Sequence, residues 1–294
     1  MTTFRYSSGS AQSTFRSPTA LSNSQIAHYA PSVMAGEAHH SRGERYSFIP
    51  TIQVIDGLRA EGFEPYEIRQ TKVRNLDKRE HTKHMVRLRH VNAINGTAVV
   101  GGEVPEIILL NSHDGSSSYQ LLAGVFRFVC SNGLIAGDMT ESVRVRHTGN
   151  VVDNVIEGAT RILHETEEVV ARIGEYKGIN LTLEESLLFA EAARQVRWGD
   201  EKPVEARALL TPHRYADRKT DLWTTFNNVQ ENLLKGGVTG RSATGRRTST
   251  RAVGGVSENV KLNKALWTLA DSMAALKIDK AMDEFAARHE HSYQ

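Results

Sequence analysis

Basic side chains alternate with other residues in two short segments of the sequence, residues 81–90, where Met85 interrupts the series, and 142–148. A period of two is typical of a half-buried β-strand, so the basic side chains of each segment share one face and mostly apolar side chains share the other. The basic positions are Lys83, Arg87, Arg89, Arg144 and Arg146. If both strands belong to one sheet, that sheet has a cationic face. We expect such a face to bind a polyanion, with nucleic acid as the favoured partner.

A second group of arginines lies in a segment that contains no carboxylate. Residues 232–257 have neither Asp nor Glu and are rich in Gly, Ser and Thr. The arginines of this segment are Arg241, Arg246, Arg247 and Arg251. The composition predicts a flexible loop at 236–257 that orders on phosphate groups, with a solvated loop that has no ligand as the alternative. A nucleotide-binding phosphate loop is disfavoured, because the Gly-Lys-Ser/Thr ending is missing.

Histidines raise an alternative chemistry, since the chain has twelve of them and several lie close together in sequence. A metal-dependent nuclease or phosphohydrolase would use His81, His113, Asp114 and His147. Helical pairs of ligands are absent, however, and Asp114-Gly115 is also typical of a simple polar turn. We therefore expect no metal and no cofactor, assign no catalytic residues, and favour a binding protein over an enzyme.

The elements that must position these residues change type near the middle of the chain. From Pro65 to Thr148 the apolar period is two, which predicts strands near 66–74, 82–91, 104–111, 119–130 and 142–147. After Asn150 the period becomes helical, and helices are predicted from Val151, from Thr182, over 221–235 and from about Ser257. The expected fold is α+β, with an N-terminal antiparallel or mixed β-sheet followed by a largely helical C-terminal half.

Three regions follow from this pattern. Residues 1–30 are rich in Ser, Thr and Gln and are expected to be a disordered leader. Residues 31–150 form the basic-faced sheet region, in which a short helix that Thr51 caps and Gly62 ends comes before the strands. Residues 151–294 form the helical region with the Arg-rich loop.

The composition of the chain argues against a disulfide-bonded, a membrane-spanning and a secreted protein. The chain has 294 residues, of which 39% are hydrophobic and 24% are charged, and its formal net charge is only +2. Attraction to nucleic acid must therefore come from local clusters of charge. The single cysteine, Cys130, excludes an internal disulfide. No apolar run is long enough for a membrane span and no signal core is present, so we expect a cytoplasmic protein.

Several segments carry a family resemblance. They are 41–46, 80–84, 111–115, 126–137, 144–150 and 221–226, of which Cys130-Ser131-Asn132-Gly133-Leu134 and Arg146-His147-Thr148 are the most specific. On these segments the chain resembles the domain of unknown function 932 family over nearly everything after residue 30. That family is carried by prophages, plasmids and other mobile elements. The resemblance implies a cytoplasmic bacterial protein of a mobile element, and it implies no catalytic residues.

These observations lead to one functional expectation and two alternatives. We expect a nucleic-acid-binding protein of a mobile element that binds single-stranded DNA and supports annealing or recombination. A homo-oligomer is possible through the apolar stripe of the C-terminal helix, 259–289, although that stripe can equally pack on its own domain. The alternatives are a metal-dependent nuclease or phosphohydrolase, and a protein that binds and inhibits a component of a host defence system.

Overall fold

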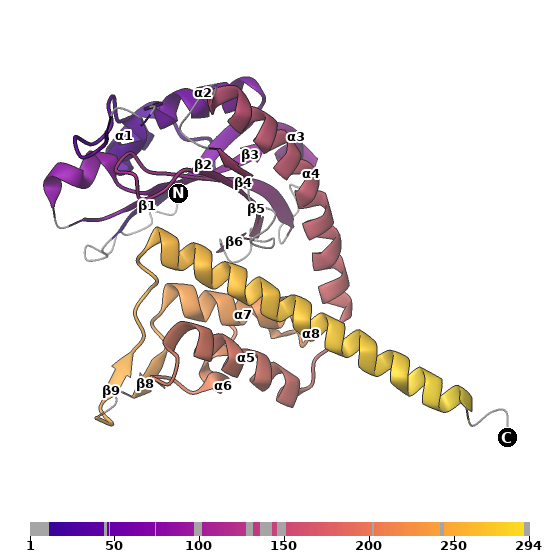
Figure 1. Ribbon diagram of the computed structural model, residues 1–294. Helices are drawn as coiled ribbons and strands as arrows, with labels where there is room; N and C mark the ends of the chain where they lie inside the picture. Colours follow the sequence, from indigo (N-terminus) through magenta and orange to yellow (C-terminus); the bar gives the residue numbers. More distant parts are fainter. Residues whose placement is uncertain are drawn as a thin grey trace. The chain divides into compact units, whose positions relative to one another are not determined.

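The computed structural model describes residues 12–290 except 44–45, 47, 74, 97–101, 128–131, 136–142, 146–150, 202 and 242–243. Figure 1 shows strands in the first half of the chain and helices in most of the second. The elements are β1 (Gln12–Arg16), α1 (Asn23–Tyr29), η1 (Pro31–Met34), α2 (Thr51–Ala60), β2 (Phe63–Thr71), η2 (Leu76–His81), β3 (His84–His90), α3 (Val91–Gly96), β4 (Glu103–Asn111), β5 (Tyr119–Arg127), β6 (Asn132–Ile135), β7 (Val143–Val145), α4 (Val151–Gly178), α5 (Leu183–Trp198), α6 (Ala206–Leu209), η3 (Tyr215–Arg218), α7 (Leu222–Lys235), β8 (Thr239–Arg241), β9 (Arg247–Ser249) and α8 (Val256–Glu290).

The chain divides into two compact units. Unit 1 comprises Met1–Glu168 together with Gly254–Val260, and unit 2 comprises Val169–Val253 together with Lys261–Gln294. The sequence places a boundary after residue 150, where the apolar period changes. In the structure α4 begins there but continues across the division between the units, and α8 also starts in unit 1 and continues into unit 2.

The strands of unit 1 form one curled antiparallel sheet (Figure 1). Its order is β1-β2-β3-β4-β5-β6, and β7 also pairs with β5. Every pairing in the described part of this sheet is antiparallel. The predicted α+β fold is therefore confirmed, with the sheet antiparallel.

One face of the sheet is covered by helices of unit 1. Figure 1 shows α2 and the first turns of α4 along this face. The close approach of α4 depends on Gly158, because a Cβ at that position would lie 2.8 Å from both Leu121 Cδ1 and Val143 Cγ1. Gly57 on α2 similarly faces Ile156 and Val152 of α4. Small residues thus allow both helices to pack closely around the apolar side chains of this layer.

The opposite face carries a smaller apolar cluster. Its buried members are Met85, Ile108, Leu110, Leu122, Ile135 and Val256. Val256 is the first residue of α8, so a segment that lies far along the chain completes the core of unit 1. The same face also carries buried charged side chains, among them Arg87, Arg89 and Glu106.

The N-terminal segment is more ordered than its composition suggests. β1 pairs along its whole length with β2, and the ring of Phe15 stacks on Tyr29 at a centroid distance of 4.0 Å. Ser22 caps α1 with a capping box. The prediction of a disordered leader over 1–30 is therefore wrong from residue 12 onward, because long-range strand pairing supplies the order that the segment lacks on its own.

Most predicted helix ends are confirmed. Thr182 caps α5 with a capping box to Glu185, Asp221 caps α7, and the residue after α7, Gly236, has φ 67°. The prediction for Thr51 is wrong, because Pro50 occupies the cap position and the Thr51 hydroxyl turns into the core. There it meets His84 Nε2 at 2.9 Å and receives a hydrogen bond from Asn111 Nδ2 at 3.0 Å.

Two glycines of α4 give a matched test of this packing. Gly158→Ala is expected to lower the free energy of unfolding by about 1–3 kcal/mol, because the added methyl group overpacks the sheet. Gly174→Ala has no neighbour within 4 Å of the new Cβ and is expected to raise stability by about 0.5–1 kcal/mol. Urea denaturation of both variants measures the difference. Equal stability of the two variants would contradict the close contact at Gly158.

Candidate nucleic-acid interface

The strand register confirms that the predicted basic residues of β3 share one face of the sheet. Arg87 lies opposite Glu67 of β2 and Ile108 of β4. Arg87 and Arg89 are nevertheless buried, with 2% and 3% of their surface exposed. Both are paired with Glu106, Arg87 Nε to Oε2 at 2.5 Å and Arg89 Nε to Oε1 at 2.8 Å. One buried carboxylate therefore bridges two buried guanidinium groups.

Rings cover the second of these guanidinium groups. The Arg89 guanidinium carbon lies 3.9 Å from the centroid of Phe126 and 4.5 Å from that of Tyr66. An arginine between two aromatic faces gains cation–π attraction, which strengthens when water is excluded. The aromatic residues of this face thus hold an arginine of the same sheet.

A second carboxylate, Glu67, holds the neighbouring strands. It accepts hydrogen bonds from Arg16 of β1, and Arg69 Nη2 lies 3.6 Å from its Oε1. Burial alone would raise the pKa of the Glu67 carboxyl group, but Arg16, Arg87 and Arg69 outweigh burial and bring that pKa to about 2. Glu67 is therefore a carboxylate at neutral pH.

The expectation of an open cationic face accordingly fails at Arg87 and Arg89, which are buried and paired with Glu106. Their partners Glu67 and Glu106 were not singled out in the sequence. A signal exists for Glu106, which precedes the apolar run 107–110 of β4, because a carboxylate at such a position needs a buried cation. Glu67 has no such signal, since β2 also contains Glu64 and Arg69.

The remaining predicted residues of the sheet have mixed surroundings. Lys83 is half-buried and donates from Nζ to Ser257 Oγ at 2.9 Å. Arg144 is exposed and lines an open pocket of about 400 Å³ with Arg161 of α4 and Glu157. Arg146 lies outside the described residues.

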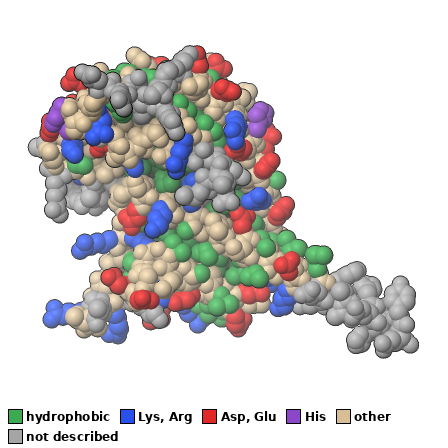
Figure 2. All heavy atoms as spheres, in the orientation of Figure 1, with side chains coloured by type: hydrophobic (Ala, Val, Ile, Leu, Met, Phe, Trp, Pro, Cys, Tyr) green, Lys and Arg blue, Asp and Glu red, His purple; other side chains and the backbone are tan. Residues whose placement is uncertain are grey.

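The four arginines of the predicted loop are all exposed. Arg241 and Arg247 lie on short strands, whereas Arg246 lies between these strands and Arg251 follows the second one. β8 and β9 form an antiparallel hairpin in which Arg241 lies directly opposite Arg247. Figure 2 shows Lys and Arg side chains gathered around this hairpin, and Arg246 and Arg251 belong to the same exposed set. The prediction of a loop over 236–257 is therefore wrong at 239–241 and 247–249, which are strands, whereas 250–255 have no regular secondary structure. We refer to residues 236–253 as the basic hairpin.

Close backbone contacts fix the base of the basic hairpin. A Cβ at Gly240 would lie 1.7 Å from the carbonyl oxygen of Pro203, and one at Gly236 would lie 2.5 Å from the carbonyl carbon of Arg251. Backbone hydrogen bonds run from Arg241 N to Pro203 O at 2.9 Å and from Val253 N to Leu234 O at 2.8 Å. Glycine is required where the backbone approaches so closely, and the result is an anchored hairpin.

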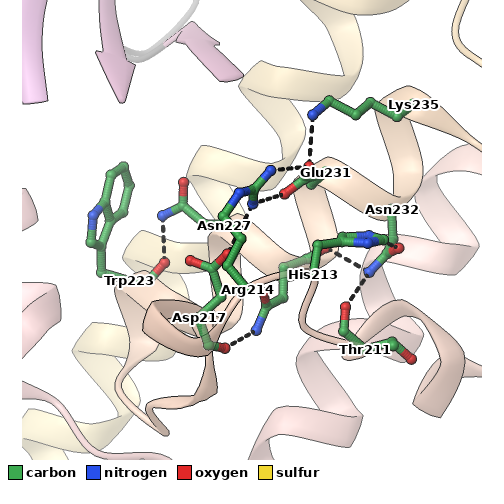
Figure 3. Close-up of polar contacts among 10 residues, drawn as sticks. Thr211, His213, Arg214, Asp217, Trp223, Asn227, Glu231, Asn232 and Lys235 are labelled. Atoms are coloured by element: carbon green, nitrogen blue, oxygen red, sulfur yellow. Dashed lines mark hydrogen bonds and ion pairs between the residues drawn. The ribbon is translucent and has the colours of Figure 1, made fainter. Parts of the chain in front are cut away.

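The helix that leads into the basic hairpin has a buried polar face (Figure 3). Arg214 makes two 2.8 Å hydrogen bonds to Glu231 of α7 and a third to Asp217. Burial would raise the pKa of the Glu231 carboxyl group, but hydrogen bonds from Arg214 and Lys235 lower it to about 2. Lys235 Nζ lies 2.6 Å from Glu231, so the charge of this lysine is already balanced where α7 ends.

Asparagines complete this network. Asn232 Oδ1 lies 2.8 Å from His213 Nε2, and Asn232 Nδ2 donates to Thr211 O at 3.0 Å. Asn227 donates to the carbonyl oxygen of Trp223 at 2.7 Å. Nearly every residue of α7 is buried, so its polar groups need these partners. The network fixes the helix from which the basic hairpin emerges.

Among the described residues of the metal alternative, His81, His113 and Asp114 are not brought together as a ligand set. His113 is fully buried, and its Nε2 lies 3.1 Å from Thr51 Oγ1 in a cluster that also contains His84. Burial lowers the pKa of His84 to about 4, so this neighbour is neutral. Asp114 accepts a hydrogen bond from Ser116 N at 2.9 Å, which is the turn that the sequence also indicates. His81 belongs to a different cluster, described below, and His147 lies outside the described residues.

No helix among the described residues combines the length and the apolar content needed to cross a membrane.

The buried carboxylate of the sheet has a testable pH signature. The pKa of Glu67 is lowered in the folded chain, so its stabilisation is complete above its ordinary pKa near 4.5 and is lost as the pH falls toward 2. Between pH 6 and pH 2 this group is expected to remove about 3 kcal/mol from the free energy of unfolding. Glu67→Gln should be less stable than wild type at pH 6. Its free energy of unfolding should also fall less than that of wild type between pH 6 and pH 2.

Urea denaturation at several pH values measures the effect. Glu201→Gln is the control, because Glu201 is exposed and should follow the wild-type curve. Parallel curves for wild type and Glu67→Gln would show that the carboxylate is not held as an ion pair.

Comparisons with known proteins identify the family. The sequence model described as "Domain of unknown function (DUF932)" matches residues 38–267. The chain is similar to the UPF0380 protein YfjQ of Escherichia coli strain K12, with 48% identity over 254 residues that cover 86% of this chain and 91% of YfjQ. It is also similar to the UPF0380 protein YafZ of the same strain, with 47% identity over 254 residues that cover 86% and 91% of the two chains. No solved structure matches the chain. The chain belongs to the domain of unknown function 932 family.

Proposed function

We propose that this protein binds nucleic acid through the basic hairpin, and that single-stranded DNA of a mobile element is its ligand. The observation that carries the proposal is the set of exposed arginines on an ordered hairpin in a segment, 232–257, that contains no Asp or Glu. Guanidinium groups bind phosphate through two parallel hydrogen bonds, so this set is suited to a nucleic-acid backbone.

The register of the hairpin supports an anionic ligand. Arg241 and Arg247 are directly opposite one another, which places two like charges on one face of a two-stranded sheet. Like charges in this position destabilise strand pairing. A phosphate group that contacts both side chains would remove the repulsion.

The anchored base of the hairpin also favours binding. Its hydrogen bonds to Pro203 and Leu234 hold the backbone in place before any ligand arrives. Less conformational entropy is then lost when the ligand binds. Contacts to phosphate from such a scaffold carry no base sequence information, so binding should tolerate any sequence.

An exposed aromatic residue of unit 2 supports the preference for single strands. Tyr215 is 86% exposed, and the guanidinium carbon of Arg218 lies 5.5 Å from its ring centroid. Unpaired bases stack on exposed aromatic rings beside arginines, whereas paired bases are stacked inside the duplex.

The proposed use is strand annealing or recombination in the cytoplasm. The support for this use is a general similarity of fold: a curled antiparallel sheet followed by a long helix is similar in outline to the arrangement of phage-type single-strand annealing proteins. Such proteins work as oligomers. On α8, Leu262 and Leu266 are buried, whereas Leu276, Ile278 and Met282 are exposed, so only the later part of the apolar stripe is free for self-association.

Replacing Arg241, Arg246 and Arg247 together with Ala should weaken binding of a fluorescent single-stranded oligonucleotide more than about tenfold at low salt. It should also reduce the slope of log affinity against log salt by about 2, because about 0.7 counterions are released for each phosphate contact. The melting temperature should change little, since these side chains are exposed.

The matched control replaces Lys177, Lys261 and Lys280, which are exposed cations outside the hairpin, so net charge falls equally. Unchanged affinity of the arginine variant would sink the assignment to the hairpin. Cleavage of the oligonucleotide in added metal would indicate a nuclease. No binding by wild type at physiological salt would remove the nucleic-acid proposal and leave a protein partner.

A further inference from the structure

A cluster of histidine and aspartate side chains lies apart from the charged sheet face and the basic hairpin. Within the described residues, His39, His40 and Asp77 offer ligand atoms that all lie within 4.8 Å of one another. His39 Nε2 is 3.2 Å, and His40 Nδ1 is 3.7 Å, from Asp77 Oδ2. The two histidines are adjacent in sequence, whereas Asp77 belongs to η2.

These spacings suit one metal ion. Zinc binds imidazole nitrogen and carboxylate oxygen at about 2.0–2.2 Å, so neighbouring ligand atoms of a tetrahedral site are roughly 3.3–3.5 Å apart. The two distances to Asp77 fall on either side of this range. Two imidazoles and one carboxylate form a donor set that suits divalent first-row transition metals.

Outer contacts already orient two of the three ligands. His39 is buried, and its Nδ1 lies 2.8 Å from Ser41 Oγ, while its Nε2 faces Asp77. Metal-binding histidines typically use the second ring nitrogen in this way, which fixes the ring. Asp77 is held through its backbone nitrogen, which donates to Asn75 Oδ1 at 3.1 Å.

A fourth side chain provides independent support. The ring of His81 packs edge-on against His39, at a centroid distance of 5.4 Å and an interplanar angle of 75°. His81 Nδ1 is buried and has no hydrogen-bond partner among the described residues. A buried nitrogen without a partner is costly, and an ion or a water molecule is the usual explanation.

We propose that His39, His40 and Asp77 bind a divalent transition-metal ion, with Zn²⁺ as the favoured metal and His81 in position to serve as a further ligand. This site is independent of the proposed nucleic-acid binding. It differs from the set predicted in sequence, of which only His81 belongs to it.

Zn²⁺ titration of full-length, tag-free, chelator-treated protein tests the proposal, with a chromophoric chelator as competitor. Wild type should bind one Zn²⁺ at this site, and His40→Ala and Asp77→Asn should each weaken that binding at least about 100-fold, more than loss of an outer contact. Both side chains are mostly exposed, so the variants should fold. His28→Ala and Asp279→Asn replace exposed residues of the same types elsewhere and should bind as wild type does.

Thermal unfolding gives a second measurement. Saturating Zn²⁺ should raise the melting temperature of wild type and of the controls but not that of the two site variants, because a ligand of the folded state stabilises it. Wild type that neither binds Zn²⁺ nor is stabilised by it would overturn the proposal. Equal Zn²⁺ affinity of wild type, His40→Ala and Asp77→Asn would also overturn it and would leave His39 and Asp77 as a hydrogen-bonded pair.

Discussion

The charged face of the sheet depends on two carboxylates that are excluded from water. Glu106 bridges Arg87 and Arg89 across β3 and β4, and Glu67 holds Arg16 and Arg69 across β1 and β2. A buried ion is stable only when an opposite charge is placed correctly, so these pairs favour one register between β1 and β2 and one between β3 and β4. If any strand slipped by one residue, charged side chains would turn into the apolar layer on the other side. The ion pairs therefore specify the arrangement of the sheet, whatever they contribute to its net stability.

Local patterns predicted much of the fold. The period of two located β2 to β5 and β7, and capping residues such as Thr182 and Asp221 located helix starts, because both signals are contained within a few residues. The order of residues 12–29 could not be seen in this way, since β1 is stabilised by pairing with β2, more than fifty residues further along the chain. The position of the Thr51 hydroxyl also depends on distant strands, because it contacts His84 of β3 and Asn111 of β4.

The candidate site also depends on contacts between distant strands, which local sequence does not predict. The types and faces of the basic residues were predictable, but their charge balance was not, because balance depends on which strands become neighbours. Arg87 and the hairpin residue Arg247 look equally suited to phosphate in the sequence. Arg87 is buried against Glu106, whereas Arg247 lies in a segment without carboxylates and is exposed. The electrostatic field of a nearly neutral chain is thus concentrated where local sequence excludes acids.

The assignment of residues 254–260 to unit 1 affects how this protein can be divided. These residues are flanked on both sides by parts of unit 2, and Val256 contributes to the apolar cluster beside Met85 and Ile108. A fragment that ends before residue 254 would lack Val256 and leave that cluster open on one side. A fragment that starts after α4 would contain residues 254–260 but not the strands on which they pack. Neither unit is a continuous stretch of chain. Exchange of whole units between relatives by a single crossover in the gene would therefore separate side chains that pack together, so the two units are expected to be inherited as one piece.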